Sequence, residues 1–381
     1  MHAVGSLIDL IRERGPVTVA AFMDLALYHP AFGYYARAAR RSGRAGDFFT
    51  SVDVGPLFGE LLAVQFAEMF ELVGDARGPS LHADLIEAGA GNGRLALDVL
   101  NGLERRAPHV LSRVALHLVE ASAAARAEHL AVLGAHAARL TSSRAELPER
   151  FAGVLFANEL LDAFPVHQVA MHGDELREIY VEEHGGALRT REGALSDERL
   201  ASHFDALDVS LAPGSIAEVS LAAIDWVAEA ARRLERGFMV FVDYGHPARE
   251  LYSVTHSQGT LTSFSKHQDT GPENAPVPLW LNRPGEQDLT SHVDFTSVQR
   301  AAEAEGMNTI ALLDQTYFVL GILTEGSQGS NRENLEKPEN LRALKTLLMP
   351  GGLGSTMKVL ILGKRVGVPA LKGCSYRVRI T

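Results

Sequence analysis

Hydrophobic and polar positions alternate along the chain in blocks that predict strands and helices in turn. Short apolar runs over residues 84–87, 114–119, 151–157 and 238–242 have the length of buried strands. Between these runs, apolar residues recur every three or four positions, as they do on the buried face of a helix. Strands that alternate with helices in this way indicate a parallel α/β core.

Individual residues mark the ends of several elements. Thr18 and Ser122 are each expected to cap the helix that follows, because a hydroxyl can accept a backbone N–H. Gly237 is expected to end the long helix that begins at Ser220. The extended pattern of residues 166–181, broken by a turn, predicts a hairpin.

The order of these elements predicts the organisation of the chain. A helical, lid-like region over residues 1–80 comes before an α/β core over residues 81–363, and residues 364–381 form a short tail. Two insertions, at about 166–215 and 247–290, interrupt the core, and we expect both to serve substrate recognition. The first includes a charged, loosely structured part.

Composition limits the class of protein. The chain has 381 residues, of which 46% are apolar, and a net charge of −11, which argues against general nucleic-acid binding. Cys374 is the only cysteine, so no disulfide forms within the chain and a reducing compartment is expected. No stretch approaches the roughly 18 apolar residues of a membrane span. The N-terminus is amphipathic, unlike a signal peptide. We therefore expect a cytoplasmic protein.

A glycine-rich turn follows the first buried strand. Glu87 comes directly before glycines at alternate positions, Gly89, Gly91 and Gly93. Glycine permits positive φ and lets a ligand approach the backbone closely, and the helix start favours a negative ligand group. A dinucleotide site has the spacing G-x-G-x-x-G, so the third glycine falls one position early for nicotinamide cofactors. The observed spacing is typical of enzymes that bind S-adenosylmethionine (SAM).

Polar residues also follow the next two strands. Glu120 ends the second strand, where an acid can accept hydrogen bonds from ribose hydroxyls; a solvated strand end is the alternative. Asn158 and Glu159 follow a third strand, at the carboxyl edge where α/β sheets bind ligands. Glu159 and Asp162, three residues apart, can share one face of a turn. The alternative is that the Asn-Glu pair caps a strand–helix junction.

The segment Gly46–Ser51 joins an acid, two aromatic residues and two hydroxyls. Asp47 and Thr50 could bond the polar ends of a ligand on which the aromatic rings pack. The alternative is a helix cap with two phenylalanines in the core.

Residues near the second insertion give weaker indications. Asp243 and His246 follow the strand at 238–242, and a site role and a structural role are both open. The spacings of His256, His267 and His292 match no zinc signature, so we expect no metal site.

Taken together, the motifs identify a family. The chain resembles the MidA-type SAM-dependent methyltransferases, which include a mitochondrial arginine methyltransferase that assists assembly of respiratory complex I. The matching segments are Phe32-Gly33-Tyr34-Tyr35, Gly46-Asp47-Phe48-Phe49-Thr50-Ser51, Phe58-Gly59-Glu60, Glu87-Ala88-Gly89-Ala90-Gly91-Asn92-Gly93, Asn158-Glu159-Leu160-Leu161-Asp162-Ala163-Phe164-Pro165-Val166, Val242-Asp243-Tyr244-Gly245-His246, Gly259-Thr260-Leu261 and Asp288-Leu289-Thr290-Ser291-His292-Val293-Asp294-Phe295.

The resemblance implies a class I methyltransferase-like, Rossmann-like doubly wound fold with a mostly parallel sheet. It implies SAM as the cofactor and a protein arginine side chain as the methyl acceptor. The residues predicted to bind the cofactor are Gly46, Asp47, Thr50, Glu87, Gly89, Ala90, Gly91, Gly93 and Glu120. The residues predicted to act in catalysis are Asn158, Glu159 and Asp162.

The expected partner is a protein substrate, with no nucleic acid and no membrane span, and a homodimer is left open. Two alternatives from other classes remain. One is an assembly factor that binds SAM without catalysis, and the other is a nicotinamide-dependent oxidoreductase.

Overall fold

The computed structural model describes residues 3–37, 51–74, 83–265, 268–269, 278–326, 337–349 and 353–376. The chain forms two compact units. The first unit comprises Met1–Phe49, Leu161–Val227 and Tyr244–Ala301, and the second comprises Thr50–Leu160, Ala228–Asp243 and Ala302–Thr381. Both predicted insertions, residues 166–215 and 247–290, fall within the first unit.

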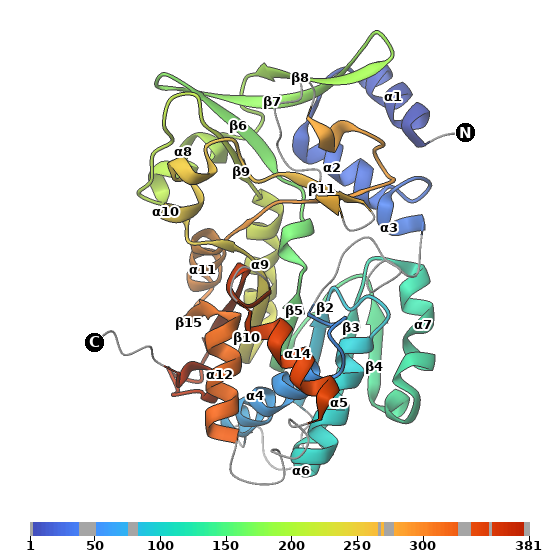
Figure 1. Cartoon of the computed structure of the whole chain (residues 1–381), viewed down its shortest axis with the longest axis vertical. Coiled ribbons are helices and arrows are strands. Elements are labelled where there is room, and N and C mark those ends of the chain that lie inside the picture. The colour runs from blue at the N-terminus through green and yellow to red at the C-terminus, as the bar shows by residue number, and fades with distance from the viewer. Residues whose placement is uncertain are drawn as a thin grey trace. The chain divides into compact units, whose positions relative to one another are not determined.

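A mostly parallel sheet forms the centre of the second unit (Figure 1). Its strands lie in the order β15-β16-β10-β5-β2-β3-β4. Parallel pairs join β2 to both β3 and β5, β3 to β4, and β5 to β10, while β15 and β16 are antiparallel. The bounds are β2 Ala83–Ala88, β3 Val114–Val119, β4 Leu140–Arg144, β5 Phe151–Asn158, β10 Leu234–His246, β15 Asn308–Asp314 and β16 Met357–Lys364. This sheet confirms the predicted α/β class.

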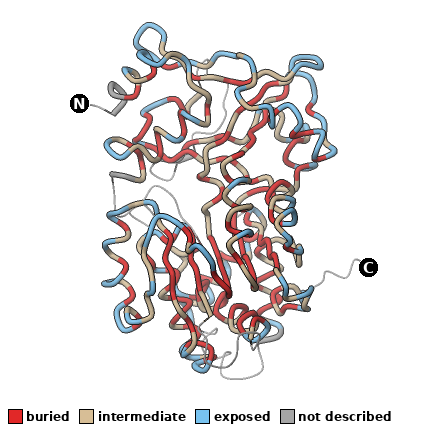
Figure 2. The backbone as a smooth tube through the Cα atoms, turned by 180° about the vertical axis from the view of Figure 1, so that it is seen from behind, coloured by how far each residue is buried: buried red, intermediate tan, exposed pale blue. Residues whose placement is uncertain are grey.

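The strand order places a switch point beside β2. The chain runs from β2 outward to β3 and β4, and then returns to β5 on the other side of β2. In open α/β sheets, ligands bind beyond the carboxyl ends of the strands at such a point. Strands β2, β3, β5, β10 and β16 are buried along most of their length, whereas the edge strands β4 and β15 are not (Figure 2). The sheet is therefore a rigid support for the loops that follow β2, β3 and β5.

Helices α4 and α5 pack closely because glycines face their contact. A Cβ on Gly59 would lie 2.5 Å from Asp98 Cβ, and one on Gly102 would lie 2.6 Å from Ala63 Cβ. The helices of this unit are α4 Leu57–Val73, α5 Arg94–Arg106, α6 Pro108–Leu111, α7 Ala123–Leu133, α12 Gln315–Gly326, α14 Pro338–Leu348 and α15 Leu353–Thr356. Helix α9, Leu221–Arg233, begins in the first unit and ends in the second. No helix of the described residues is both long enough and apolar enough to cross a membrane.

The first unit is built on antiparallel sheets. One sheet has the order β1-β7-β6-β9, with β8 added on β7, and a smaller one has the order β12-β11-β13. The strands are β1 Val17–Thr18, β6 His167–His172, β7 Glu175–His184, β8 Ala187–Gly193, β9 Ile216–Val219, β11 Thr262–Ser265, β12 Gln268–Asp269, β13 Asp288–Thr290 and β14 Val293–Asp294. The helices are α1 Ala3–Arg14, α2 Val19–Tyr28, α3 Tyr34–Arg37, α8 Glu198–Ala206, α10 Ala248–Leu251 and α11 Phe295–Ala304.

Several local predictions can be compared with these elements. Thr18 Oγ1 accepts the Ala21 N–H at 3.1 Å and Ser122 Oγ accepts the Ala125 N–H at 3.3 Å, so both caps are confirmed. The predicted hairpin is β6 and β7. The charged stretch after it was expected to be loosely structured, and that expectation is wrong, because it contains β8 and α8.

Gly237 does not end a helix, contrary to the prediction. It lies within β10 with φ +138°, in register with Gly153 of β5, whose φ is +153°. A Cβ on Gly237 would lie 1.9 Å from Gly153 O, and a Cβ on Gly153 would lie 2.0 Å from Asp84 O. The two glycines therefore let β2, β5 and β10 approach one another closely. Gly237 is needed for this close approach and not for the end of a helix.

This crossing gives a stability prediction. Gly153→Ala should lower the free energy of unfolding by more than about 3 kcal/mol, because the backbone of β2 must move to admit the methyl group. Chemical denaturation measures this change. Gly134→Ala is the control, since Gly134 also has positive φ, +51°, but has open space around its Cβ position. If both variants lost a similar amount of unfolding free energy, the close approach of the strands at Gly153 would not be the cause of the loss.

Candidate functional site

The glycine turn leaves backbone bare at the switch point. Gly89, Gly91 and Gly93 have φ values of +72°, +52° and +86°, which favour glycine. The amides of Gly89 and Ala90 both donate to Val119 O, at 2.9 and 3.1 Å, which ties the turn to the end of β3. No atom of the described residues lies within 4 Å of the position that a Cβ on Gly91 would take. The turn therefore offers a ligand an open surface.

Two side chains form hydrogen bonds with the backbone of Gly91, one with its amide and one with its carbonyl. Glu120 Oε2 accepts the Gly91 N–H at 2.8 Å, and Glu120 Oε1 accepts the Ser122 N–H at 2.7 Å. The buried His129 places Nε2 2.9 Å from Gly91 O and Nδ1 2.9 Å from Ser143 Oγ. Because a carbonyl only accepts, Nε2 carries the proton. His129 was missed from the sequence, where it looks like an ordinary residue inside a helix.

Two amides in the first turn of α5 are also occupied. Glu87 is 4% exposed, and its Oε2 accepts the Ala96 N–H at 3.0 Å. The Asn92 side chain accepts the Arg94 N–H at 3.2 Å. Side chains of the chain itself thus satisfy several of the donors that were expected to face a negative ligand group. Burial raises the pKa of Glu87 well above its ordinary range, because it penalises the charged form.

The end of β5 is strained. Glu159 has φ +52°, which is rare for a residue with a side chain. Its N–H donates to Val242 O at 2.9 Å, and its Oε1 accepts from Asn158 Nδ2 at 3.0 Å and from the Ser51 N–H at 3.4 Å. Such strain persists where surrounding contacts enforce it and is concentrated at functional sites. The strained conformation favours a functional role over the alternative of a simple capping pair.

Asn158 carries an unused acceptor. Its Oδ1 is buried and has no hydrogen-bond partner among the described residues. A buried acceptor without a donor costs about 1–3 kcal/mol. A ligand rich in N–H groups would recover that free energy.

Asp243 has a supporting role in the second unit. It is buried, and its Oδ2 accepts the Leu160 N–H at 3.0 Å. Leu160 in turn places Cδ1 3.1 Å from the Cβ position of Gly89. Asp243 therefore fixes the residue that borders the glycine turn.

Asp162 belongs to the first unit, where it is held by β13 and the residue after it. Its Oδ2 accepts the Thr290 hydroxyl at 2.7 Å, and its carbonyl accepts the Ser291 N–H at 3.1 Å. Its Oδ1 is buried without a partner in the described part of the chain. Burial raises the pKa of Asp162 to about 6.

Three predicted cofactor residues, Gly46, Asp47 and Thr50, lie outside the described residues. Ser51, which follows them, is buried and donates its hydroxyl to Gln315 Oε1 at 3.2 Å. The end of the predicted loop is thus anchored in the second unit by both its amide and its side chain.

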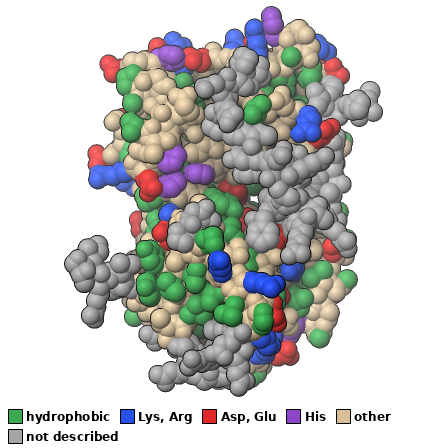
Figure 3. Space-filling view, viewed as in Figure 1, with side chains coloured by type: hydrophobic (Ala, Val, Ile, Leu, Met, Phe, Trp, Pro, Cys, Tyr) green, Lys and Arg blue, Asp and Glu red, His purple; other side chains and the backbone are tan. Residues whose placement is uncertain are grey.

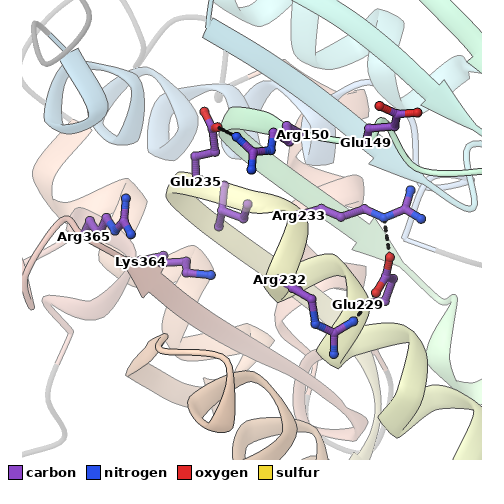
Figure 4. Close-up of a pocket in the computed structure, with 9 residues that line it drawn as sticks. Glu149, Arg150, Glu229, Arg232, Arg233, Glu235, Lys364 and Arg365 are labelled. Atoms are coloured by element: carbon purple, nitrogen blue, oxygen red, sulfur yellow. Dashed lines mark hydrogen bonds and ion pairs between the residues drawn. The ribbon is translucent and has the colours of Figure 1, made fainter.

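A charged pocket of about 580 Å³ lies elsewhere in the second unit (Figure 4). It is lined by Arg150, which precedes β5, and by Leu234, which begins β10. These are the amino ends of the strands, opposite to the glycine turn. Its side chains largely pair with one another, as Arg233 does with Glu229 at 2.6 Å. We therefore place the functional site at the glycine turn.

Comparison with known proteins identifies the family of this chain. A family model described as "Putative S-adenosyl-L-methionine-dependent methyltransferase" matches residues 61–313. A Caenorhabditis elegans protein named Protein arginine methyltransferase NDUFAF7 homolog, mitochondrial, is 30% identical over 77% of this chain and 70% of its own length. Its Drosophila melanogaster counterpart is 28% identical over 94% and 85%. A solved structure from Burkholderia thailandensis, bound to S-adenosyl-homocysteine, is 28% identical, with a TM-score of 0.84 over 98% of this chain and 94% of that one.

These matches confirm the resemblance stated from the sequence, and with it SAM as the cofactor. The expected cytoplasmic location is contradicted, because the relatives are named as mitochondrial proteins. The cytoplasmic expectation depended on the single cysteine and on the lack of a long apolar stretch, and neither feature distinguishes one compartment from another.

The open space at Gly91 can be tested by filling it. Gly91→Val should abolish SAM binding in titration calorimetry, because the side chain would occupy the surface that the ligand needs. Gly134→Val is the matched control, since Gly134 has nearly the same φ, +51°, and equally open surroundings. If Gly91→Val bound SAM as the control does, the ligand would lie elsewhere.

Proposed function

Because this chain belongs to the family of SAM-dependent methyltransferases, we propose that it transfers the methyl group to an arginine side chain of a protein. The names of the relatives support this acceptor. The observation that carries the proposal is the strained Glu159 next to the buried Asn158 Oδ1, which has no hydrogen-bond partner in the described part of the chain. A guanidinium has five N–H donors and no acceptor, so it suits a site that offers carboxylate and amide oxygens.

For the cofactor, the proposed contacts follow from the glycine turn. Each carboxylate oxygen of Glu120 accepts one backbone amide, so two of the roughly four acceptor positions of the carboxylate are used. The remaining positions would accept the ribose hydroxyls. Gly89, Ala90, Gly91 and Gly93 would give the bare surface, and Glu87 would serve the amino-acid end. Gly46, Asp47 and Thr50 remain proposed contacts.

SAM, when bound, supplies a methyl group on a positively charged sulfur. The work of the chain is to align the attacking nitrogen with that group and to exclude water. The Glu159 carboxylate would hold the guanidinium through charge-assisted hydrogen bonds. As the new N–C bond forms and the S–C bond breaks, the nitrogen must lose a proton, and Glu159 would accept it. Asn158 Oδ1 would fix the orientation of the guanidinium.

Asp162 is proposed as a further contact to the substrate. Its buried Oδ1, which has no hydrogen-bond partner among the described residues, could accept from a donor of the substrate. A carboxylate must be ionised to attract a guanidinium strongly. The raised pKa of Asp162 therefore has a consequence for the pH dependence of the reaction.

Methyl transfer is tested with label. The purified chain is incubated with methyl-labelled SAM and a cell lysate, and a lysate protein should become labelled. Mass spectrometry of the labelled protein should then find methylarginine. Glu159→Gln should keep SAM binding but lower transfer by about 100-fold or more, because general base catalysis contributes about 10²–10⁴-fold. Glu149→Gln, an exposed change beside the charged pocket, is the control and should transfer at the normal rate. Binding of SAM without labelled protein would instead favour the assembly factor that does not catalyse transfer.

The pH dependence tests Asp162. With its pKa near 6, kcat/KM for an arginine substrate should fall as the pH drops below about 6, where the carboxyl group becomes protonated. Asp162→Asn should be less active and should lose this acidic limb. An unchanged limb in the variant would assign the titration to another group.

A further inference from the structure

Three histidines of the first unit converge, although their spacing in the sequence gives no sign of it. His246 is the last residue of β10, His256 ends the short helix Val254–His256, and His292 lies between β13 and β14. One side-chain nitrogen of each lies within 4.8 Å of the others. The ring centroids are 4.9, 5.3 and 5.8 Å apart. Figure 3 shows histidine side chains gathered on the visible face, between the places of α10 and α11 in Figure 1.

The backbone fixes all three residues. Parallel pairing of β10 with β14 sets His246 beside Asp294. The His292 N–H donates to Thr260 Oγ1 at 3.1 Å, and the His256 N–H donates to Ser253 O at 3.0 Å. The cluster is therefore held by three separate segments of the chain.

Glu250 lies beside two of the rings. His256 Nδ1 lies 3.1 Å from Glu250 O, and because a carbonyl only accepts, Nδ1 carries the proton and Nε2 keeps its lone pair. His246 Nδ1 lies 2.9 Å from Glu250 Oε1. Carbonyl and carboxylate oxygens commonly hold the outer nitrogen of a metal-binding histidine in this way.

The third ring, His292, lacks a hydrogen-bond partner at one nitrogen among the described residues. That nitrogen, Nδ1, is buried. A buried imidazole nitrogen without such a partner is available to a metal ion.

We propose that His246, His256 and His292 bind a divalent transition-metal ion of the zinc class. Imidazole nitrogens suit zinc, copper, iron and nickel ions, and three histidines with an open fourth position form a recognised zinc arrangement. Ligand atoms on a tetrahedral zinc ion lie about 3.3 Å apart, given bonds of about 2.0–2.1 Å. Binding would therefore require the three nitrogens, now within 4.8 Å of one another, to move closer by side-chain rotation. Glu250 is the outer residue that positions the rings, and the site is independent of the proposed methyl transfer.

Metal titration tests the proposal. The full chain, without a histidine tag and stripped with a chelator, is titrated with Zn²⁺ in a calorimeter and with Co²⁺ in a spectrophotometer. We expect one ion per chain and a visible Co²⁺ absorption band typical of low coordination number. His256→Ala should weaken binding by more than about 100-fold, because loss of an outer partner alone costs about 10–100-fold. His172→Ala is the control, since His172 pairs with Glu192 on an exposed hairpin.

Further variants keep the result interpretable. Glu250→Gln should weaken binding by about 10–100-fold if it orients the rings. If His256→Ala fails to fold by circular dichroism, His292→Gln replaces it and should show the same loss. Absence of stoichiometric binding by the native chain would overturn the proposal. So would equal binding by the native chain and a folded ligand variant, because the ion would then be held by other residues.

Discussion

The hydrogen bond from the Gly91 amide to Glu120 is the contact on which the site depends. It holds Glu120, which follows β3, against the turn that follows β2. His129 forms a second hydrogen bond, with the carbonyl of Gly91. Gly91 is therefore fixed from both sides while its Cβ position stays open. A clamp of this kind removes the conformational freedom of glycine, which a ligand would otherwise have to restrict on binding.

The end of β5 is held in an analogous way. Asp243 accepts the Leu160 amide, Leu160 borders Gly89, and the Glu159 amide is fixed on Val242. These contacts keep Glu159 in a backbone conformation that an unconstrained glutamate would rarely adopt. The strained residue follows β5, the strand that pairs with β2 and that approaches its neighbours closely at Gly153. The rigid sheet and the strained loop are parts of the same arrangement.

Much of this could be predicted from the sequence, because the signals are local. The apolar runs gave the strands, the caps at Thr18 and Ser122 depend on one hydroxyl each, and the glycine spacing distinguished a SAM turn from a dinucleotide turn. Gly237 was misread because a glycine needed for close strand approach looks like one that ends a helix. His129 could not be found, since its role depends on the distant Gly91 carbonyl. The convergence of His246, His256 and His292 likewise comes from strand pairing and loop folding, which spacing along the chain does not reveal.

The most direct test of the account is a crystal structure of this chain with S-adenosyl-homocysteine bound. The account predicts that the nucleoside lies over the bare backbone at Gly91, with its ribose hydroxyls within hydrogen-bond distance of Glu120, about 2.5–3.0 Å. A ligand bound elsewhere, or a Glu120 side chain turned away from the sugar, would contradict it.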